Sequence, residues 1–164
     1  MSQLKPKPVK ESQVIRTEIV HPGDTNPLGT IFGGTVVAWI DMAAAMCAMR
    51  HARTNAVTAS IDAVSFLSPV KVGEFVIIKA SVNYTGKTSM EIGVRVESEH
   101  PKTGERKHTA SAYLTFVAID EKGRPIPVPP VLPETDVEKK RFKMAEKRRA
   151  SRLKIAKERE EIYK

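Results

Sequence analysis

Apolar residues recur at every second position in four segments between residues 57 and 120. This period of two is typical of β-strands that bury one face. Because turn-forming glycine and proline residues separate the segments, we expect consecutive antiparallel strands at residues 57–67, 74–84, 88–100 and 106–120. A further strand is expected at residues 11–20. The alternating apolar positions are Val57, Ala59, Ile61 and Ala63, then Val76, Ile78, Ala80, Val82 and Tyr84, then Met90, Ile92, Val94 and Val96, and finally Ala110, Ala112, Leu114, Phe116 and Ala118.

Residues 35–53 follow a different pattern, because they are rich in alanine and methionine and contain no glycine or proline. They predict an α-helix with apolar side chains on nearly every side, and such a helix is usually wrapped by other structure. Basic residues gather at its end, as the helix dipole favours. An antiparallel sheet curled around one central buried helix is an α+β architecture, and this is the fold that we expect.

The two ends of the chain differ in composition from the middle. Residues 1–10 are expected to be flexible, residues 11–124 to form the domain, and residues 125–135 to form a proline-rich linker. Residues 136–164 are expected to be a basic tail, either a solvated helix or partly disordered. Residues 138–164 contain 12 Lys or Arg and 5 Glu, which is most of the total net charge of +8. The domain itself is therefore nearly neutral, and the basic composition says little about its partner.

The composition favours a cytoplasmic protein of one domain. A length of 164 residues suits a single domain, and no uncharged run reaches the roughly 18 residues of a membrane-spanning helix. The first residues lack the apolar segment of a secretory signal. The single cysteine, Cys47, excludes an internal disulfide and a zinc site built from several cysteines. Since it lies among alanines and methionines, we interpret it as a buried, unreactive thiol and expect no metal site.

Asp41 is the only charged residue between Thr35 and Met49. A carboxylate among apolar side chains loses hydration, which strengthens it as a proton acceptor. Asp41 is therefore a candidate general base. The alternative interpretation is a partly exposed side chain that is hydrogen-bonded to a neighbouring strand.

Gly33 and Gly34 stand where the expected helix begins. Unpaired backbone N–H groups and the positive end of the helix dipole meet there, and glycine lets a ligand approach the backbone closely. This combination suits the stabilisation of an oxyanion. An ordinary loop-to-helix turn could have the same sequence, so the two glycines alone do not distinguish an oxyanion site from such a turn.

Two loops carry further candidate residues. Asn26 lies before the helix, and its amide can orient a water molecule or hold a carbonyl group, although an Asn before proline is often only a turn former. Between two expected strands, the turn residues Gly86, Lys87, Thr88 and Ser89 offer a cation, two hydroxyls and backbone amides to a phosphate group. An ordinary hairpin with a solvated lysine is the alternative.

Several stretches resemble, in order, the hotdog-fold acyl-CoA hydrolases, which include short bacterial thioesterases of broad specificity and the cytosolic brain-type enzyme. The resemblance covers about residues 11–130 and is carried by Asn26-Pro-Leu-Gly-Thr-Ile-Phe-Gly-Gly34, Trp39-Ile-Asp41, Val57-Thr-Ala-Ser-Ile-Asp62, Phe66-Leu-Ser-Pro-Val70, Gly86-Lys-Thr-Ser-Met-Glu91 and Thr115-Phe-Val-Ala-Ile-Asp120.

The resemblance implies a hotdog fold, a dimer with one continuous sheet, and commonly a hexamer formed as a trimer of dimers. It implies an active site in which Asn26 and Asp41 come from different subunits and the Gly34 amide holds the oxyanion. The substrate would be acyl-CoA, with no separate cofactor. The turn at residues 86–89 is similar to the segment that contacts the CoA nucleotide and phosphates in this family. Gly33 is included with the turn residues Gly86, Lys87, Thr88 and Ser89 as expected contacts of the substrate.

The expected reaction is hydrolysis of acyl-CoA to free CoA and a carboxylic acid. In one mechanism Asp41 deprotonates a water molecule that Asn26 positions, and in the other Asp41 attacks the thioester and forms an anhydride. A different reading is a non-catalytic domain that senses acyl-CoA, with the basic tail on nucleic acid or lipid. Nucleic-acid binding is not favoured, because no DNA-binding helix pattern precedes the domain. A dehydratase or hydratase is also disfavoured, because none of the four histidines falls within nine residues of Asp41.

Overall fold

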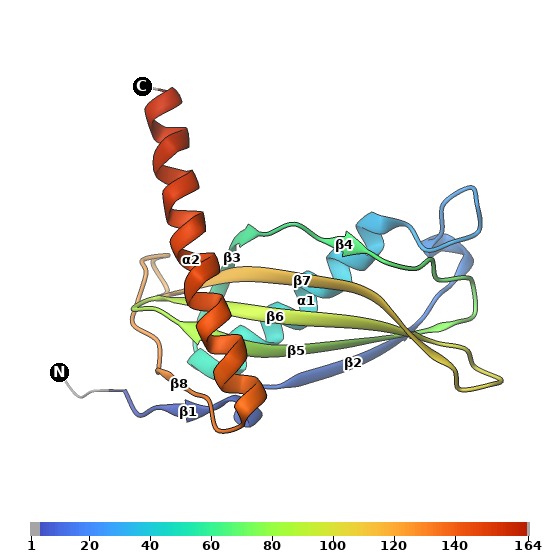
Figure 1. The fold of residues 1–164 in the computed structure, drawn as a ribbon, viewed down its shortest axis with the longest axis horizontal. Helices are drawn as coiled ribbons and strands as arrows, with labels where there is room; N and C mark the ends of the chain where they lie inside the picture. Colours follow the sequence, from blue (N-terminus) through green and yellow to red (C-terminus); the bar gives the residue numbers. More distant parts are fainter. Residues whose placement is uncertain (1–3, 164) are drawn as a thin grey trace.

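The computed structural model describes residues 4–163, and its centre is one curved antiparallel sheet. The strands follow the order β2-β5-β6-β7-β3, and the short strand β4 also pairs with β7. Helix α1, Gly33–Ala52, lies along one face of this sheet (Figure 1). The expected α+β arrangement of a sheet curved around a helix is thus confirmed. The strands are β2 Val14–Ile19, β3 Asn55–Ile61, β4 Ser65–Phe66, β5 Phe75–Thr85, β6 Ser89–Glu99 and β7 Arg106–Ile119.

Small side chains let α1 approach the sheet closely. The side of α1 that faces the sheet is fully buried and consists largely of alanine, with Ile40, Cys47 and His51 among the larger residues. The alternating apolar residues of β5, β6 and β7 bury the opposite half of the core, as the period of two predicted. This packing removes apolar surface from water and is the main stabilising contribution to the fold.

The other side of α1 is not wrapped, which differs from the expectation. Ala38, Met42, Met46 and Met49 form an exposed stripe, because their spacing of three and four residues places them on one side of the helix. The nearby strand β3 is an edge strand with exposed apolar residues, and Val57 and Ile61 are 46% and 41% exposed. One chain therefore leaves an apolar surface open beside α1.

The single strand expected at residues 57–67 is divided in the structure. Strand β3 ends at Ile61 and β4 begins at Ser65, so residues 62–64 lie outside the pairing. The pairing of β3 with β7 also shifts between Thr58 and Ser60, which makes Ala59 an extra residue in a β-bulge. The alternation of apolar residues therefore did not predict which β3 side chains face the helix.

Both segments that flank the domain pack against it. Strand β1, Lys7–Pro8, pairs in parallel with β8, Val131–Leu132, and short 3-10 helices follow at Val9–Glu11 and Pro22–Asp24. The Lys7 ammonium donates a hydrogen bond to the His51 carbonyl over 2.7 Å, and Nε2 of His51 lies 2.8 Å from the Pro129 carbonyl. Residues 4–10 and the proline-rich segment are therefore ordered parts of the domain, whereas residues 1–3 lie outside the described part.

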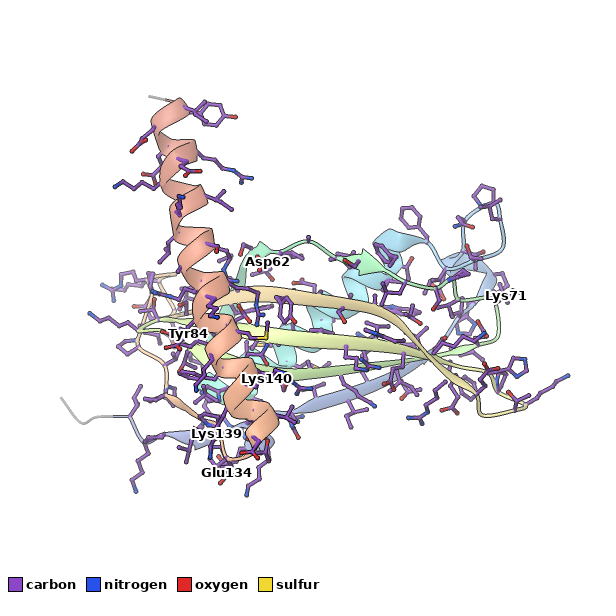
Figure 2. All side chains as sticks on the ribbon, in the orientation of Figure 1. Asp62, Lys71, Tyr84, Glu134, Lys139 and Lys140 are labelled. Atoms are coloured by element: carbon purple, nitrogen blue, oxygen red, sulfur yellow. The ribbon has the colours of Figure 1, made fainter. Side chains whose placement is uncertain are left out.

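The tail forms one long helix, α2, Asp136–Ile162. It begins with a capping box, in which the Thr135 side chain accepts from the Glu138 N–H and the Glu138 carboxylate accepts from the Thr135 N–H. Its first half crosses the face of the sheet opposite α1, and its second half projects beyond the sheet (Figure 1). Figure 2 shows Tyr84 and Asp62 next to this helix, at two levels along it. None of the helices within residues 4–163 is long and apolar enough to span a membrane.

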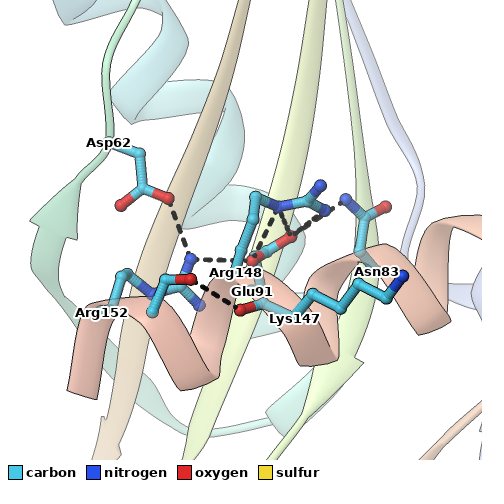
Figure 3. A network of polar contacts seen from close by, with 7 residues as sticks. Asp62, Asn83, Glu91, Lys147, Arg148 and Arg152 are labelled. Atoms are coloured by element: carbon cyan, nitrogen blue, oxygen red, sulfur yellow. Dashed lines mark hydrogen bonds and ion pairs between the residues drawn. The ribbon is translucent and has the colours of Figure 1, made fainter. Parts of the chain in front are cut away.

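An ion-pair network fixes α2 to the sheet (Figure 3). Glu91 projects from β6 and is only 2% exposed, so its charge requires close partners. Arg148 and Arg152 bind the two oxygens of this carboxylate over 2.7 and 2.9 Å, and Arg152 also binds Asp62 over 2.9 Å. The Arg148 guanidinium lies 3.7 Å above the centre of the Tyr113 ring. Two arginines of the basic tail are therefore structural residues rather than solvated charges.

We expect Arg148→Met to reduce the free energy of unfolding by about 3 kcal/mol, because it leaves the buried Glu91 carboxylate with one partner fewer. Urea unfolding followed by circular dichroism measures the change. Lys143→Met is the matched control, since Lys143 is an exposed residue of the same helix. Equal unfolding midpoints for the two variants would contradict the role of the network.

We also expect stability to fall in mild acid through His51. Burial is the largest influence on this imidazole and lowers its pKa from the ordinary value of 6.5. Below pH 6.5 the unfolded chain therefore binds a proton that the folded chain does not, so the folded state loses stability as the pH falls towards the lowered pKa. In His51→Gln this component of the pH dependence should be absent, whereas the exposed His21→Gln should retain it. Thermal unfolding between pH 7.5 and 5 tests this, and an unchanged pH dependence in His51→Gln would refute it.

Candidate active site

Helix α1 begins at Gly33, directly after Phe32. The first bonds of the helix run from the N–H groups of Thr35 and Val36 to the Phe32 carbonyl, which leaves the N–H groups of Gly33 and Gly34 without a partner within residues 4–163. A Cβ atom on Gly34 would overlap the ring of Phe32, so glycine makes room for that ring. Free amides at the positive end of the helix dipole can stabilise a developing negative charge.

Asp41 is half-buried on α1, beside strand β3. The Thr58 hydroxyl donates a hydrogen bond to its Oδ1 atom over 2.7 Å. Within the described part of the chain, Oδ2 accepts no hydrogen bond and no cation pairs with the carboxylate. Asp41 is thus a charged group held at one oxygen and open at the other. That arrangement suits a base that must take a proton from a ligand or a water molecule.

The surroundings of Asp41 differ from those that the sequence predicted. One expectation was a carboxylate among apolar side chains, but the exposed stripe of α1 leaves this side open in one chain. The structure agrees with the alternative, a partly exposed side chain that is hydrogen-bonded to a neighbouring strand. Thr58 had no assigned role, although a hydroxyl within an apolar strand was a signal of a polar contact. The β-bulge at Ala59 follows Thr58 directly, and bulges commonly re-aim side chains next to active sites.

Asn26 organises its own loop. Its Oδ1 atom accepts hydrogen bonds from the N–H groups of Leu28 over 3.0 Å and Thr30 over 3.3 Å, and its Nδ2 atom lies 3.0 Å from the Thr30 hydroxyl. The structure therefore shows Asn26 as a turn former. No hydrogen bond joins it to Asp41 within the described residues of one chain, so its contribution to catalysis remains a prediction.

The turn between β5 and β6 lies against helix α2. The Gly86 N–H donates to the Ser89 carbonyl over 2.8 Å, and a Cβ atom on Gly86 would lie 2.8 Å from the Ser89 hydroxyl. The same position lies 3.6 Å from the Nε atom of Arg149, which sequence reasoning did not select. Lys87 is exposed at the tip of the turn. The predicted phosphate-binding residues are thus side by side and have an additional cation close by.

Other nucleophilic or titratable groups near α1 are poor candidates. Cys47 is buried as predicted, and burial raises the pKa of its thiol to about 12, so the thiol stays protonated and unreactive. His51 is buried and directed at the Pro129 carbonyl. None of the four histidines forms a hydrogen bond with Asp41 in residues 4–163, which gives no support to the dehydratase reading.

Residues 28–105 match the thioesterase superfamily. An uncharacterized acyl-CoA thioester hydrolase, YkhA, of Bacillus subtilis is 47% identical over 129 residues, which cover 79% of this chain and 75% of that protein. A cytosolic acyl coenzyme A thioester hydrolase of Rattus norvegicus is 38% identical over 143 residues, which cover 85% of this chain and 38% of the longer rat protein.

Solved structures agree with these relatives. The crystal structure of an apo-hexameric acyl-CoA thioesterase superposes with a TM-score of 0.90 at 49% identity, covering 93% of this chain and 98% of that one. The acyl-CoA hydrolase of Staphylococcus aureus, in complex with butyryl coenzyme A, coenzyme A and coenzyme A disulfide, has a TM-score of 0.86 at 41% identity, covering 96% and 99%. That enzyme has also been solved as variants in which an asparagine, an aspartate or a threonine is replaced by alanine.

The similarity to solved thioesterases extends over nearly the whole chain, so it covers the fold as well as the site. The site consists of the free amides at the start of α1 and the half-exposed Asp41 beside β3. The chain belongs to the thioesterase superfamily, within the hotdog-fold acyl-CoA thioester hydrolases.

Proposed function

We propose that this protein is an acyl-CoA thioesterase that hydrolyses acyl-CoA to free CoA and a carboxylic acid. The observation that carries the proposal is the Asp41 carboxylate, which Thr58 holds at Oδ1 and which is open at Oδ2, on the helix that begins with free amides. Asp41 lies seven residues after Gly34, about 10 Å along the helix at a rise of about 1.5 Å per residue. A thioester lying along the first turns of α1 can reach both groups.

The sequence separations between Asn26, Asp41 and Thr58 support the same site. The asparagine and the aspartate replaced in the Staphylococcus aureus enzyme stand 15 residues apart, and the aspartate and the threonine stand 17 residues apart. In this chain the same separations connect Asn26, Asp41 and Thr58. We infer that these three residues occupy the corresponding places in the site, which includes Thr58 although the sequence reading gave it no role.

In the mechanism that we propose, the open oxygen of Asp41 takes a proton from a water molecule as the water attacks the thioester carbonyl. The carbonyl oxygen gains negative charge, which the amide of Gly34 and the dipole of α1 stabilise. The carbon–sulfur bond then breaks, the CoA thiolate leaves and takes up the proton held by Asp41, and the carboxylic acid remains. Asn26, supplied by a second subunit, orients the water. The hydrogen bond from Thr58 fixes the rotamer of Asp41 and keeps its other oxygen directed at the substrate.

We infer an oligomer from the open surface beside α1. Strand β3 ends the sheet with unpaired backbone groups, and such an edge commonly pairs with another chain. Pairing of two β3 strands would cover Val57, Ile61 and the methionine stripe of α1 and form one continuous sheet. The related apo-hexameric thioesterase supports the further expectation of a hexamer built from such dimers.

The relatives also bear on the location and on the non-catalytic alternative. We propose a cytoplasmic location, which the cytosolic relative from rat supports. A domain that only senses acyl-CoA is not favoured, because several of the matching proteins are acyl-CoA hydrolases by name. Release of free thiol from acyl-CoA, with substrates from acetyl- to palmitoyl-CoA, tests hydrolysis and gives the preferred chain length.

We expect Asp41→Asn to keep the fold and lower kcat by about 10²- to 10⁴-fold, because an amide cannot accept the proton. Thiol release from butyryl-CoA measures kcat, and circular dichroism checks the fold. Glu121→Gln, an equivalent change at an exposed turn, should have the activity of the unmodified protein. Undiminished turnover by folded Asp41→Asn would remove Asp41 from the mechanism.

We expect Thr58→Ala to lower kcat about tenfold, because it removes the hydrogen bond that holds Asp41. Thr58→Ser keeps the hydroxyl and should retain most of the activity, which makes it the matched control. If serine and alanine at this position gave the same kcat, the hydroxyl would have no part in orienting Asp41.

A further inference from the structure

A polar cavity lies on the outer face of the sheet, beside the first half of α2. Its volume is about 360 Å³, which is large enough for a small molecule. Strands β2, β5, β6 and β7 supply most of its lining, and Arg141 of α2 completes it. Asp41 belongs to α1, which packs on the other face of the sheet. The cavity therefore has no part in the proposed hydrolysis.

Asn83 is the most buried polar residue of this cavity and is only 6% exposed. It is the extra residue of a β-bulge in β5, between Val82 and Tyr84, and bulges commonly re-aim a side chain. Its Nδ2 atom lies 3.4 Å from the Glu91 carboxylate, which can only accept hydrogen bonds, so Oδ1 points away from Glu91 (Figure 3). Within residues 4–163 this oxygen accepts no hydrogen bond. It is suited to receive an O–H or N–H group of a ligand.

Gly93 of β6 makes room for the Asn83 amide and for the cavity. A Cβ atom at this position would overlap the amide. Glycine inside a strand weakens the strand and often marks a place where a ligand approaches closely. In the register Gly93 lies opposite Ser81 of β5 and Tyr113 of β7, and the hydroxyls of these two residues have no hydrogen-bond partner in the described part of the chain. The centre of the sheet thus presents several unused polar groups at one hollow.

The charge of the lining is positive. Lys79 and Arg95 bind the same carboxylate, that of Glu97, over 3.0 and 2.8 Å. Arg141 forms no ion pair among residues 4–163. Three cations of the lining therefore have one carboxylate between them. A ligand with a carboxylate would supply the missing negative charge through charge-assisted hydrogen bonds.

The cavity adjoins the ion-pair network that holds α2. Asn83 donates to Glu91 on the side away from the cavity, and the Arg148 guanidinium lies 3.7 Å above the centre of the Tyr113 ring. A ligand that contacts Asn83 and Tyr113 would thus restrain two residues that touch the network. Because a ligand that binds only the folded protein stabilises it, filling the cavity would also stabilise the docked position of α2.

We propose that this cavity binds a small hydroxy acid, with its carboxylate at Arg141 and its hydroxyl donating to Oδ1 of Asn83. The cations require a negative charge in the ligand, and the free acceptor of Asn83 requires a donor on the same molecule. The proposal does not depend on the proposed thioesterase function, because the cavity and Asp41 lie on opposite faces of the sheet.

Calorimetric titration with 3-hydroxybutyrate tests the ligand class. We expect saturable binding with a Kd of about 1 mM, which is within reach of a ligand with so few atoms. Butyrate, which lacks the hydroxyl, and 3-hydroxybutyramide, which lacks the charge, should each bind about tenfold more weakly. Asp41→Asn should bind the probe as the unmodified protein does. Absence of saturable binding, equal binding of the three compounds, or a changed Kd in Asp41→Asn would overturn the proposal.

Variants of the lining test the place of binding. Arg141→Ala removes an exposed cation, and Ser81→Val fills the cavity without touching an ion pair, so we expect both to weaken 3-hydroxybutyrate binding about tenfold or more. Lys143→Ala, at an exposed position of α2 outside the lining, is the matched control. The probe should raise Tm in the unmodified protein and in the control, but not in the two cavity variants.

An unchanged Kd in folded Arg141→Ala and Ser81→Val proteins would overturn the proposal, because the probe would then bind elsewhere. Light scattering addresses a different occupant of the cavity, namely a second subunit. We expect Arg141→Ala and Ser81→Val to have the same oligomer mass as the unmodified protein. A lower mass in both variants, together with no binding of the probe, would identify the cavity as a contact between subunits and refute the ligand site.

Discussion

The packing of one side of helix α1 against the curved sheet is the interaction on which the rest of the structure depends. Alanines and Cys47 bring the helix close to strands β5, β6 and β7, and this contact fixes the rotation of α1 about its axis. The rotation in turn places Asp41 at the margin between buried and open sides, next to β3. A carboxylate at this margin is accessible to water and is close enough to the strand for Thr58 to orient it.

The two faces of the sheet are covered by helices that use different chemistry. On the inner face apolar burial holds α1, whereas on the outer face the buried Glu91 carboxylate holds α2 through Arg148 and Arg152. A charge that is buried this deeply is stable only while its partners stay in place. The contact between α2 and the sheet therefore requires one particular position of the helix. The same contacts keep Arg149 beside the turn at residues 86–89.

The periods of apolar residues predicted the sheet and the helix, because those patterns follow from burial of one face, whereas the family was identified from the resemblance of short motifs. They did not predict the open side of α1, since a sequence of small apolar residues does not distinguish burial within one chain from burial between chains. The docking of α2 was also missed. The side of α2 that faces the sheet consists of Phe142, Ala145, Arg148 and Arg152, and because two of these residues are arginines the sequence shows no regular apolar stripe. Thr58 escaped notice because alternation does not reveal the β-bulge at Ala59 and so does not show which side chains of β3 reach Asp41.

The central claim is that Asp41 activates water rather than attacking the thioester itself. A single turnover of butyryl-CoA in ¹⁸O-labelled water, followed by mass spectrometry of the product and of the peptide containing Asp41, tests it most directly. Direct hydrolysis predicts one labelled oxygen in the butyrate and none in the peptide. Label in the Asp41 carboxylate would contradict the claim, because only an anhydride intermediate can place it there.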